Sequence, residues 1–71
     1  MDVKHDTDRR IARNVRTGIA GRGLTQGEVA RVALMNESGL SRCLTGSRQW
    51  RVDEVYRIAT LLGKSMEELV K

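Results

Sequence analysis

The 71-residue sequence has no proline and no phenylalanine, and it contains only one tryptophan and one tyrosine. With so few aromatic rings, its core must be built from aliphatic side chains. A chain of this length fits one domain and buries only roughly 60% of the surface that its unfolded form exposes. Several short helices suit this content better than a β-sandwich does. We therefore expect an all-α fold with a modest margin of stability.

Cysteine and histidine each occur only once. The single Cys43 cannot form a disulfide within the chain, and a lone thiol is typical of proteins in a reducing compartment. His5 lies far from Cys43 in the sequence, and Cys43 is expected to face the core, so these residues indicate no metal site. The chain also lacks a glycine loop that would cradle a phosphate. We therefore expect no cofactor and no enzymatic activity.

Long hydrophobic runs are missing as well. The longest wholly apolar stretches have two to four residues, whereas a helix needs roughly 20 to cross a bilayer. The N-terminus shows no signal-peptide pattern. These observations predict a soluble, cytoplasmic protein without a membrane partner.

Positive charge is plentiful and unevenly placed. The net charge is +4, but residues 9–51 alone contain nine arginines against only Glu28 and Glu37. Such a concentration is expected of a surface that meets polyanionic nucleic acid. A solubilising arginine face would have the same composition, so charge alone leaves both interpretations open.

Residues 8–23 show the pattern of an amphipathic helix. Asp8 is a plausible N-cap, and apolar residues recur at Ile11, Val15 and Ile19. The segment Gly21-Arg22-Gly23 is typical of a helix C-terminus. Residues 1–7 are predicted to form a flexible tail and residues 8–71 the folded domain. Gly18 costs a helix about 1 kcal/mol relative to alanine, and the sequence offers no reason for it.

Residues 24–45 read as two short helices separated by one tight corner. Thr25 and Glu28 have the spacing of a capping box, so a helix should begin at Gln26. Its small inward residues are Val29, Ala30 and Ala33. After the corner, Asn36 is a strong N-cap residue. The second helix then turns Leu40, Cys43 and Leu44 inward and Glu37, Ser38, Ser41 and Arg42 outward.

Two further helices complete the chain. One is expected over about residues 52–62, with Val55, Ile58, Ala59 and Leu62 inward. Gly63 should end it. Ser65 and Glu68 then form a second capping box, which opens a short terminal helix. For the single Trp50, packing at the edge of the core is the first choice, and stacking near a nucleic acid or a dimer contact are alternatives.

These residues together resemble the helix-turn-helix domains of phage repressors, Cro proteins and their bacterial relatives, the XRE-like family. The similarity covers about residues 24–70. It includes Leu24-Thr25-Gln26, Val29, Ala30, Ser41-Arg42, Thr45-Gly46, Ile58-Ala59, Leu62-Gly63 and the run from Ser65 to Leu69. The resemblance implies a lambda-repressor-like compact bundle of about five short helices.

The sequence departs from this family in two places. The corner usually carries glycine, and here it carries Leu34, which should find a positive φ unfavourable and is expected to force a different turn. The fourth helix often opens with proline, and here the corresponding run is Trp50-Arg51-Val52. These departures affect the helix crossing and the loop over residues 45–52.

The resemblance implies that the helix after Asn36 lies in the major groove of double-stranded DNA. The candidate base-reading residues are Asn36, Glu37, Ser38, Ser41 and Arg42. Arg42 suits guanine, Glu37 suits the amino group of cytosine, and Asn36 either caps the helix or reads adenine. The candidate phosphate-binding residues are Thr25, Gln26, Thr45, Gly46, Ser47 and Arg48. Gly46 would let main-chain amides approach an anion, although an ordinary surface turn has the same composition.

The resulting functional hypothesis is a sequence-specific transcriptional regulator, a Cro-like phage or prophage repressor that binds a palindromic operator as a homodimer. No small-molecule ligand is expected. The alternative is an antitoxin-like or anti-repressor module that uses the same helices to engage another protein. The outward side of residues 36–48 is polar, which favours DNA over an apolar partner.

Overall fold

The computed structural model describes residues 3–71, and it describes side chains from residue 6 onward. It contains five helices, which are α1 (Val3–Arg22), α2 (Gln26–Ala33), α3 (Glu37–Thr45), α4 (Val52–Leu62) and α5 (Met66–Val70). No strand occurs in this part of the chain. The predicted all-α fold is therefore confirmed, and the starts of α2, α3 and α4 agree with the sequence pattern.

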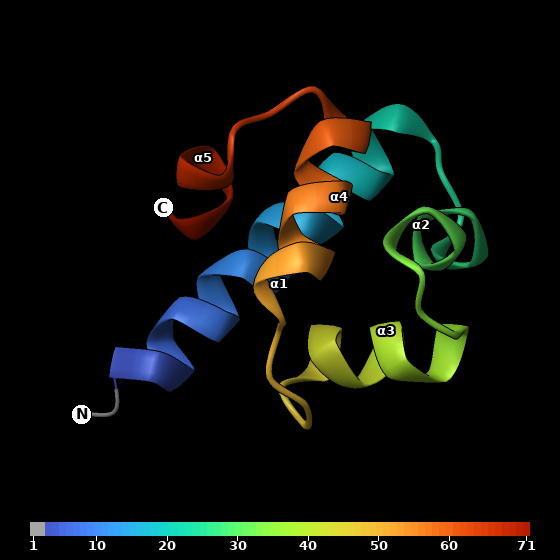
Figure 1. Ribbon diagram of the computed structural model, residues 1–71. Helices are drawn as coiled ribbons and strands as arrows, with labels where there is room; N and C mark the ends of the chain where they lie inside the picture. The colour runs from blue at the N-terminus through green and yellow to red at the C-terminus, as the bar shows by residue number, and fades with distance from the viewer. Residues whose placement is uncertain (1–2) are drawn as a thin grey trace.

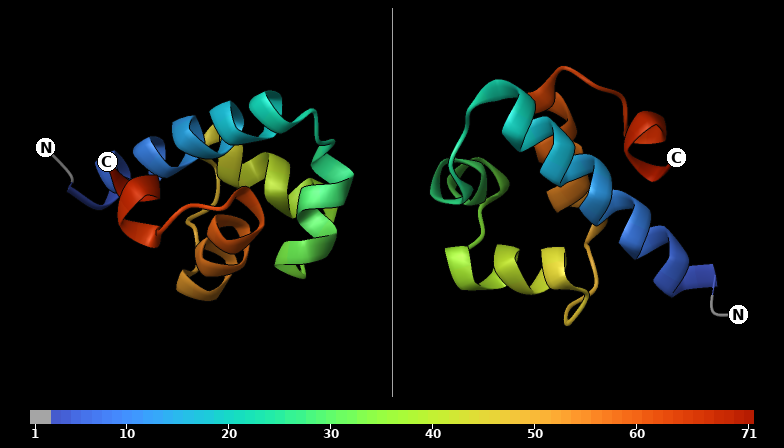
Figure 2. Two further views of the ribbon diagram at one scale, coloured as in Figure 1. Left: turned by 90° about the horizontal axis from the view of Figure 1, so that it is seen from above. Right: turned by 180° about the vertical axis from the view of Figure 1, so that it is seen from behind.

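The long helix α1 organises the bundle. It contacts α3, α4 and α5, while α2 packs against α3 and α4. In Figure 1, α4 crosses in front of α1 and α3 lies along the lower edge of the molecule. Figure 2 shows α1 from behind, with α5 returning to lie beside it. This arrangement leaves one side of α3 against the bundle and the other side at the surface.

The core is aliphatic, as the composition predicted. Its largest fully buried side chains are Leu40, Ile58, Leu69, Val15, Val29 and Cys43. Trp50 closes the edge of this core, and its Nε1 donates a hydrogen bond to the carbonyl of Asp8 at 3.2 Å. The predicted packing role of Trp50 is confirmed.

The first helix begins earlier than predicted. It starts at Val3, so the assignment of Asp8 as an N-cap is wrong. Nothing between residues 3 and 8 breaks a helix, and the extension allows Asp6 to pair with Arg10 at 2.8 Å. The flexibility expected of residues 1–7 stays a prediction, and Met1 and Asp2 lie outside the described residues.

Four helices have an arginine bonded to a carbonyl at their C-terminal end. The pairs are Arg57 with Ala33 of α2, Arg16 with Leu44 of α3, Arg22 with Leu62 of α4, and Arg13 with Lys71 after α5. The last carbonyls of a helix have no partner within it and lie at the negative end of its dipole. A guanidinium therefore stabilises them both by a hydrogen bond and by its charge. These arginines hold the bundle together.

Gly18 has a steric explanation. A Cβ at this position would lie 2.5 Å from Cδ1 of Leu62, which is itself buried in the core. The missing side chain lets α1 and α4 approach closely enough to bury Leu62 between them. The close approach of the two helices accounts for a glycine in the middle of α1.

The corner between α2 and α3 has a backbone conformation that was not predicted. Leu34 adopts φ 60° and ψ 42°, the left-handed conformation that glycine usually supplies. Its amide donates to the carbonyls of Ala30 and Arg31, and the amide of Met35 donates to Ala30 at 2.8 Å. The expectation that Leu34 forces a different turn is therefore wrong, because these bonds offset a cost of about 1–2 kcal/mol.

Leu34→Gly should stabilise the protein. The Leu34 side chain is 75% exposed, so its removal loses little burial and relieves the left-handed strain. We expect the free energy of unfolding to rise by roughly 0.5–1.5 kcal/mol in urea titrations. The control Val32→Gly, in the helical part of α2, should lower it. An unchanged or lower stability of Leu34→Gly would show that this turn is unstrained.

Candidate nucleic-acid interface

The position of α3 is fixed by its cap and by its inner side. Oδ1 of Asn36 accepts a hydrogen bond from the amide of Gly39 at 2.6 Å, which confirms Asn36 as the N-cap. Leu40, Cys43 and Leu44 are buried along the inner side. Since side chains three and four residues apart share one side of a helix, the opposite side must face solvent.

The predicted base-reading residues all lie on that outer side. Asn36, Glu37, Ser38, Ser41 and Arg42 are exposed. The ion pairs of the described residues join Arg10 with Asp6, Arg48 with Glu54 and Arg57 with Asp53, so Arg42 keeps its guanidinium unpaired. The structure thus brings the five candidates together, with Asn36 already engaged as a cap.

The start of α2 forms a second part of the interface. The Thr25 hydroxyl accepts from the Glu28 amide at 3.1 Å, and a Glu28 carboxylate oxygen accepts from the Thr25 amide at 3.4 Å. This capping box uses Thr25 internally. The first turn of α2 has two more amides, those of Gln26 and Gly27. Within the described chain, neither of them has an acceptor. Gln26 is exposed beside them.

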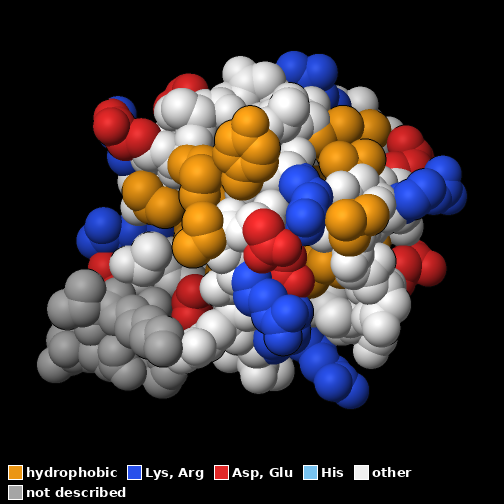
Figure 3. Space-filling model, viewed as in Figure 1, with side chains coloured by type: hydrophobic (Ala, Val, Ile, Leu, Met, Phe, Trp, Pro, Cys, Tyr) orange, Lys and Arg blue, Asp and Glu red, His pale blue; other side chains and the backbone are white. Residues whose placement is uncertain are grey.

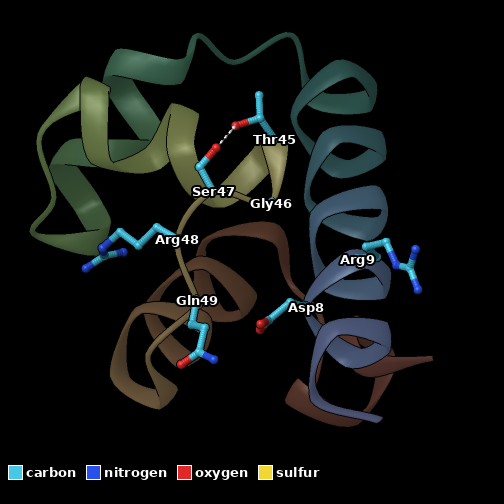
Figure 4. Close-up of a pocket in the computed structure, with 7 residues that line it drawn as sticks. All are labelled: Asp8, Arg9, Thr45, Gly46, Ser47, Arg48 and Gln49. Carbon is cyan, nitrogen blue, oxygen red and sulfur yellow. Dashed lines mark hydrogen bonds between the residues drawn. The ribbon is translucent and has the colours of Figure 1, made fainter. Parts of the chain in front are cut away.

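The backbone amides of the loop after α3 donate hydrogen bonds to the last turn of that helix. Gly46 ends α3 with φ 88°, and the amides of Gly46, Ser47 and Arg48 all donate to the carbonyls of Arg42 or Cys43. These three amides are thus engaged within the loop, and the contact of Gly46 with an anion stays a prediction. The hydroxyls of Thr45 and Ser47 lie 3.4 Å apart at the surface (Figure 4), and that of Thr45 also donates to the Arg42 carbonyl at 3.2 Å.

A cleft of about 600 Å³ separates this loop from α1. In Figure 4, the Asp8 carboxylate points toward the loop, whereas the Arg9 side chain points away from it. A carboxylate that faces the cleft opposes the binding of an anion there. Thr45 and Ser47 line the same cleft, so their hydroxyls share it with this carboxylate.

Arg48 has a different role from the one its position predicted. Its guanidinium bonds both carboxylate oxygens of Glu54, at 3.0 and 2.7 Å, and also donates to the Cys43 sulfur at 2.9 Å. Glu54 is only 5% exposed, and it also accepts from the Arg51 amide at 3.0 Å. Arg48 thus fastens the loop to α4, which makes it a poor donor to DNA phosphate.

The electrostatics of this cluster follow from burial and pairing. Burial alone would raise the pKa of Glu54, but the hydrogen bonds from Arg48 and from the Arg51 amide outweigh it and hold the pKa below the ordinary value. Burial raises the pKa of the Cys43 thiol, although Arg48 opposes that effect. Glu54 is therefore a charged, buried anchor.

Arg51 is a functional candidate that sequence reasoning missed. It is exposed, has no ion pair among the described residues, and lines a polar cleft of about 430 Å³ together with Ser38 and Arg42. Lys and Arg side chains extend from the start of α4 to the lower edge of the face in Figure 3. No local sequence signal would have found Arg51, because its free side chain depends on the buried Glu54 that binds its amide.

Neither a metal site nor a membrane-spanning helix is found among the described residues. No group of three or more His, Cys, Asp and Glu side chains there is placed to hold a metal ion. Within residues 3–71, every helix is too short or too polar to cross a bilayer.

Comparisons with known proteins agree with this geometry. The family described as "Helix-turn-helix domain" matches residues 8–70. Among solved structures, the chain is similar to a hypothetical transcription factor, NHTF, from Neisseria, with a TM-score of 0.84 and 20% sequence identity over 96% of this chain and 78% of that chain. At this identity the similarity concerns the fold alone. Comparison with proteins of curated function gives no match.

Glu54→Gln tests the anchor that holds the loop. The variant keeps the side-chain shape but removes the charge facing Arg48, so the free energy of unfolding at neutral pH should fall by roughly 1–3 kcal/mol. Because folding depresses the pKa of Glu54, its contribution is present above the unfolded value of about 4.3 and is lost as the pH falls through the folded-state value.

The difference between wild type and Glu54→Gln should therefore shrink in acid. Urea titrations at several pH values measure it, and Glu67→Gln, at an exposed position on α5, serves as the control. An equal difference at every pH would contradict the pairing, as would an effect no larger than that of Glu67→Gln.

Proposed function

Because this chain belongs to the helix-turn-helix domain family, we propose that it is a sequence-specific transcriptional regulator that binds double-stranded DNA through α3. The observation that carries this proposal is the outer side of α3, where Ser38, Ser41 and Arg42 face solvent while the inner side is buried. The major groove of B-DNA is wide enough to admit a helix, and its base edges distinguish all four base pairs.

Base reading is proposed for the outer residues of α3. The unpaired guanidinium of Arg42 can bond O6 and N7 of guanine together. Glu37 can accept from N4 of cytosine, and the hydroxyls of Ser38 and Ser41 suit several base edges. Asn36 has its amide nitrogen free for a base, while its oxygen already accepts the capping bond from Gly39.

Phosphate contacts are proposed on both sides of α3. Gln26 offers its side chain and a free amide at the positive end of α2, and the loop offers the hydroxyls of Thr45 and Ser47. We add Arg51, whose side chain is exposed and unpaired. Thr25, Gly46 and Arg48 support this surface by shaping the helix ends and the loop. Such contacts supply affinity and register without reading sequence.

We propose further that residues 8–71 form the DNA-binding domain of a Cro-like phage or prophage repressor that binds a palindromic operator as a homodimer. One reading helix covers only a few base pairs, and a symmetric dimer places two such helices about 34 Å apart on one side of the DNA. Val52 and Tyr56 support a contact on α4, since they are 75% and 60% exposed. Val52 lines a cleft of about 340 Å³ between α1, α4 and α5.

The rival function is an antitoxin-like or anti-repressor module that binds another protein. What favours it is the same exposed apolar surface, which includes Val32 and Leu34 on the α2 side and Val52 and Tyr56 on α4. None of these large apolar residues lies on α3. Gel shifts at two salt concentrations separate the functions, because DNA binding through phosphates must weaken as salt rises.

Arg42→Ala tests the reading helix, once bound sites have been selected from random DNA. Loss of a bidentate contact should cost about 1–3 kcal/mol on the selected site and relax one base position. Arg51→Ala should weaken binding to all sequences alike and reduce the salt slope by about one unit. Lys64→Ala, between α4 and α5 at the opposite edge of the molecule from α3, is the control (Figure 1). If Arg42→Ala leaves the selected sequence unchanged, the readout assignment is wrong.

Val52→Glu tests the dimer surface. A charge on this exposed apolar residue should leave folding intact but abolish the cooperative binding of two copies to a palindromic site. Gel shifts on a whole site and on a half-site measure the effect, with Val32→Glu on α2 as the control. Unaltered cooperativity in Val52→Glu would exclude α4 from the dimer contact.

A further inference from the structure

The carboxylate of Glu37 lies against the start of the neighbouring helix α2. A Cβ placed on Gly27 would be 3.1 Å from Oε1 of Glu37 and 3.3 Å from its carboxylate carbon. Glycine at this position is what lets the carboxylate come so near the backbone. Glu37 belongs to α3, so the contact joins the helix proposed to read bases with the helix end proposed to bind phosphate.

The place that Glu37 occupies is favourable for an anion. The capping box uses the amides of Thr25 and Glu28, while Gln26 and Gly27 keep theirs unbonded among the described residues. The positive end of the α2 dipole lies at this same turn, and Glu37 also stands in the first turn of α3. The carboxylate thus sits in the field of two helix starts, where a DNA phosphate is proposed to bind beside Gln26.

A carboxylate and a phosphate cannot share this place without repulsion. Two unit charges about 4 Å apart in water interact by about 1 kcal/mol, which corresponds to roughly a five-fold change in affinity. Glu37 has no ion-pair partner within the described residues that would neutralise it. Its charge therefore opposes the phosphate contact as long as the side chain rests on Gly27.

We propose that Glu37 acts as an electrostatic gate that determines specificity by covering the phosphate-binding start of α2 in the free protein. On a matching sequence, Glu37 leaves Gly27 and accepts a hydrogen bond from the amino group of cytosine, which opens the start of α2 to the phosphate. On other sequences the carboxylate finds no such donor and continues to repel the backbone. This proposal rests on the proposed function. In it, Glu37 both reads a base and weakens the binding of non-specific DNA.

Glu37→Gln tests the gate on two DNA duplexes at equal salt concentration. On a random-sequence duplex, the variant should bind roughly three- to ten-fold more tightly than wild type, because the repulsion is gone. On the selected site it should gain less or lose affinity, so that the ratio of specific to non-specific affinity falls. Glu67→Gln makes the same change of charge on α5 and should alter both affinities less than about two-fold, since salt screens charges over about 10 Å.

A measurement without DNA tests the resting position of Glu37 separately. At neutral pH, Glu37→Gln should shift the amide resonance of Gly27, because it removes the charge that lies beside this residue. Glu67→Gln should leave that resonance in place. Equal shifts in the two variants, or no shift in Glu37→Gln, would overturn the gate whatever the protein binds.

The DNA measurements have their own contrary outcomes. Equal gains by Glu37→Gln and Glu67→Gln would overturn the gate and leave the proposed function standing, because net charge alone would then explain them. Equal losses by Glu37→Gln on both duplexes would also overturn it. Failure of wild type and variants alike to bind either duplex would overturn the proposed function, and the gate with it.

Discussion

The burial of one side of α3 is the constraint on which the rest of the structure depends. Leu40, Cys43 and Leu44 are held against the bundle, and Asn36 fixes the residue at which the helix begins. A change in either would rotate or shift the polar residues away from the surface they share. The loop after α3 is held in a similar way, because the ion pair of Arg48 with the buried Glu54 fixes where α4 begins relative to α3.

Two groups of arginines in this chain have different roles, and Arg10, which pairs with Asp6, belongs to neither. One group bonds carbonyls at helix ends or a buried carboxylate, and its members are Arg13, Arg16, Arg22, Arg48 and Arg57. The other group, Arg42 and Arg51 among it, is exposed without an ion pair among the described residues. Arg42 and Arg51 have no ion pair that would hold their guanidinium groups away from DNA. The charge density of residues 9–51 thus reflects the cohesion of a small bundle as well as the proposed binding surface.

Local signals in the sequence predicted the helices and the exposed side of α3. The capping boxes at Thr25 and Ser65 and the N-cap at Asn36 form as expected, because each needs only residues within one turn. The sequence did not reveal the close approach at Gly18 or the buried role of Glu54. Both depend on partners in other elements, which no local pattern contains. Leu34 was misjudged because intrinsic preference disfavours its turn, whereas the amides of Leu34 and Met35 hold it by bonds to the carbonyls of Ala30 and Arg31.

The central claim is that the outer side of α3 and the start of α2 together meet DNA. The most direct test is to follow backbone amide resonances of the protein as a selected duplex is added. The account predicts that the largest changes fall on residues 26–28, on residues 36–47 and around residue 51, while α5 changes only where copies meet. Changes confined to α4 and α5, with α3 unaffected, would contradict it.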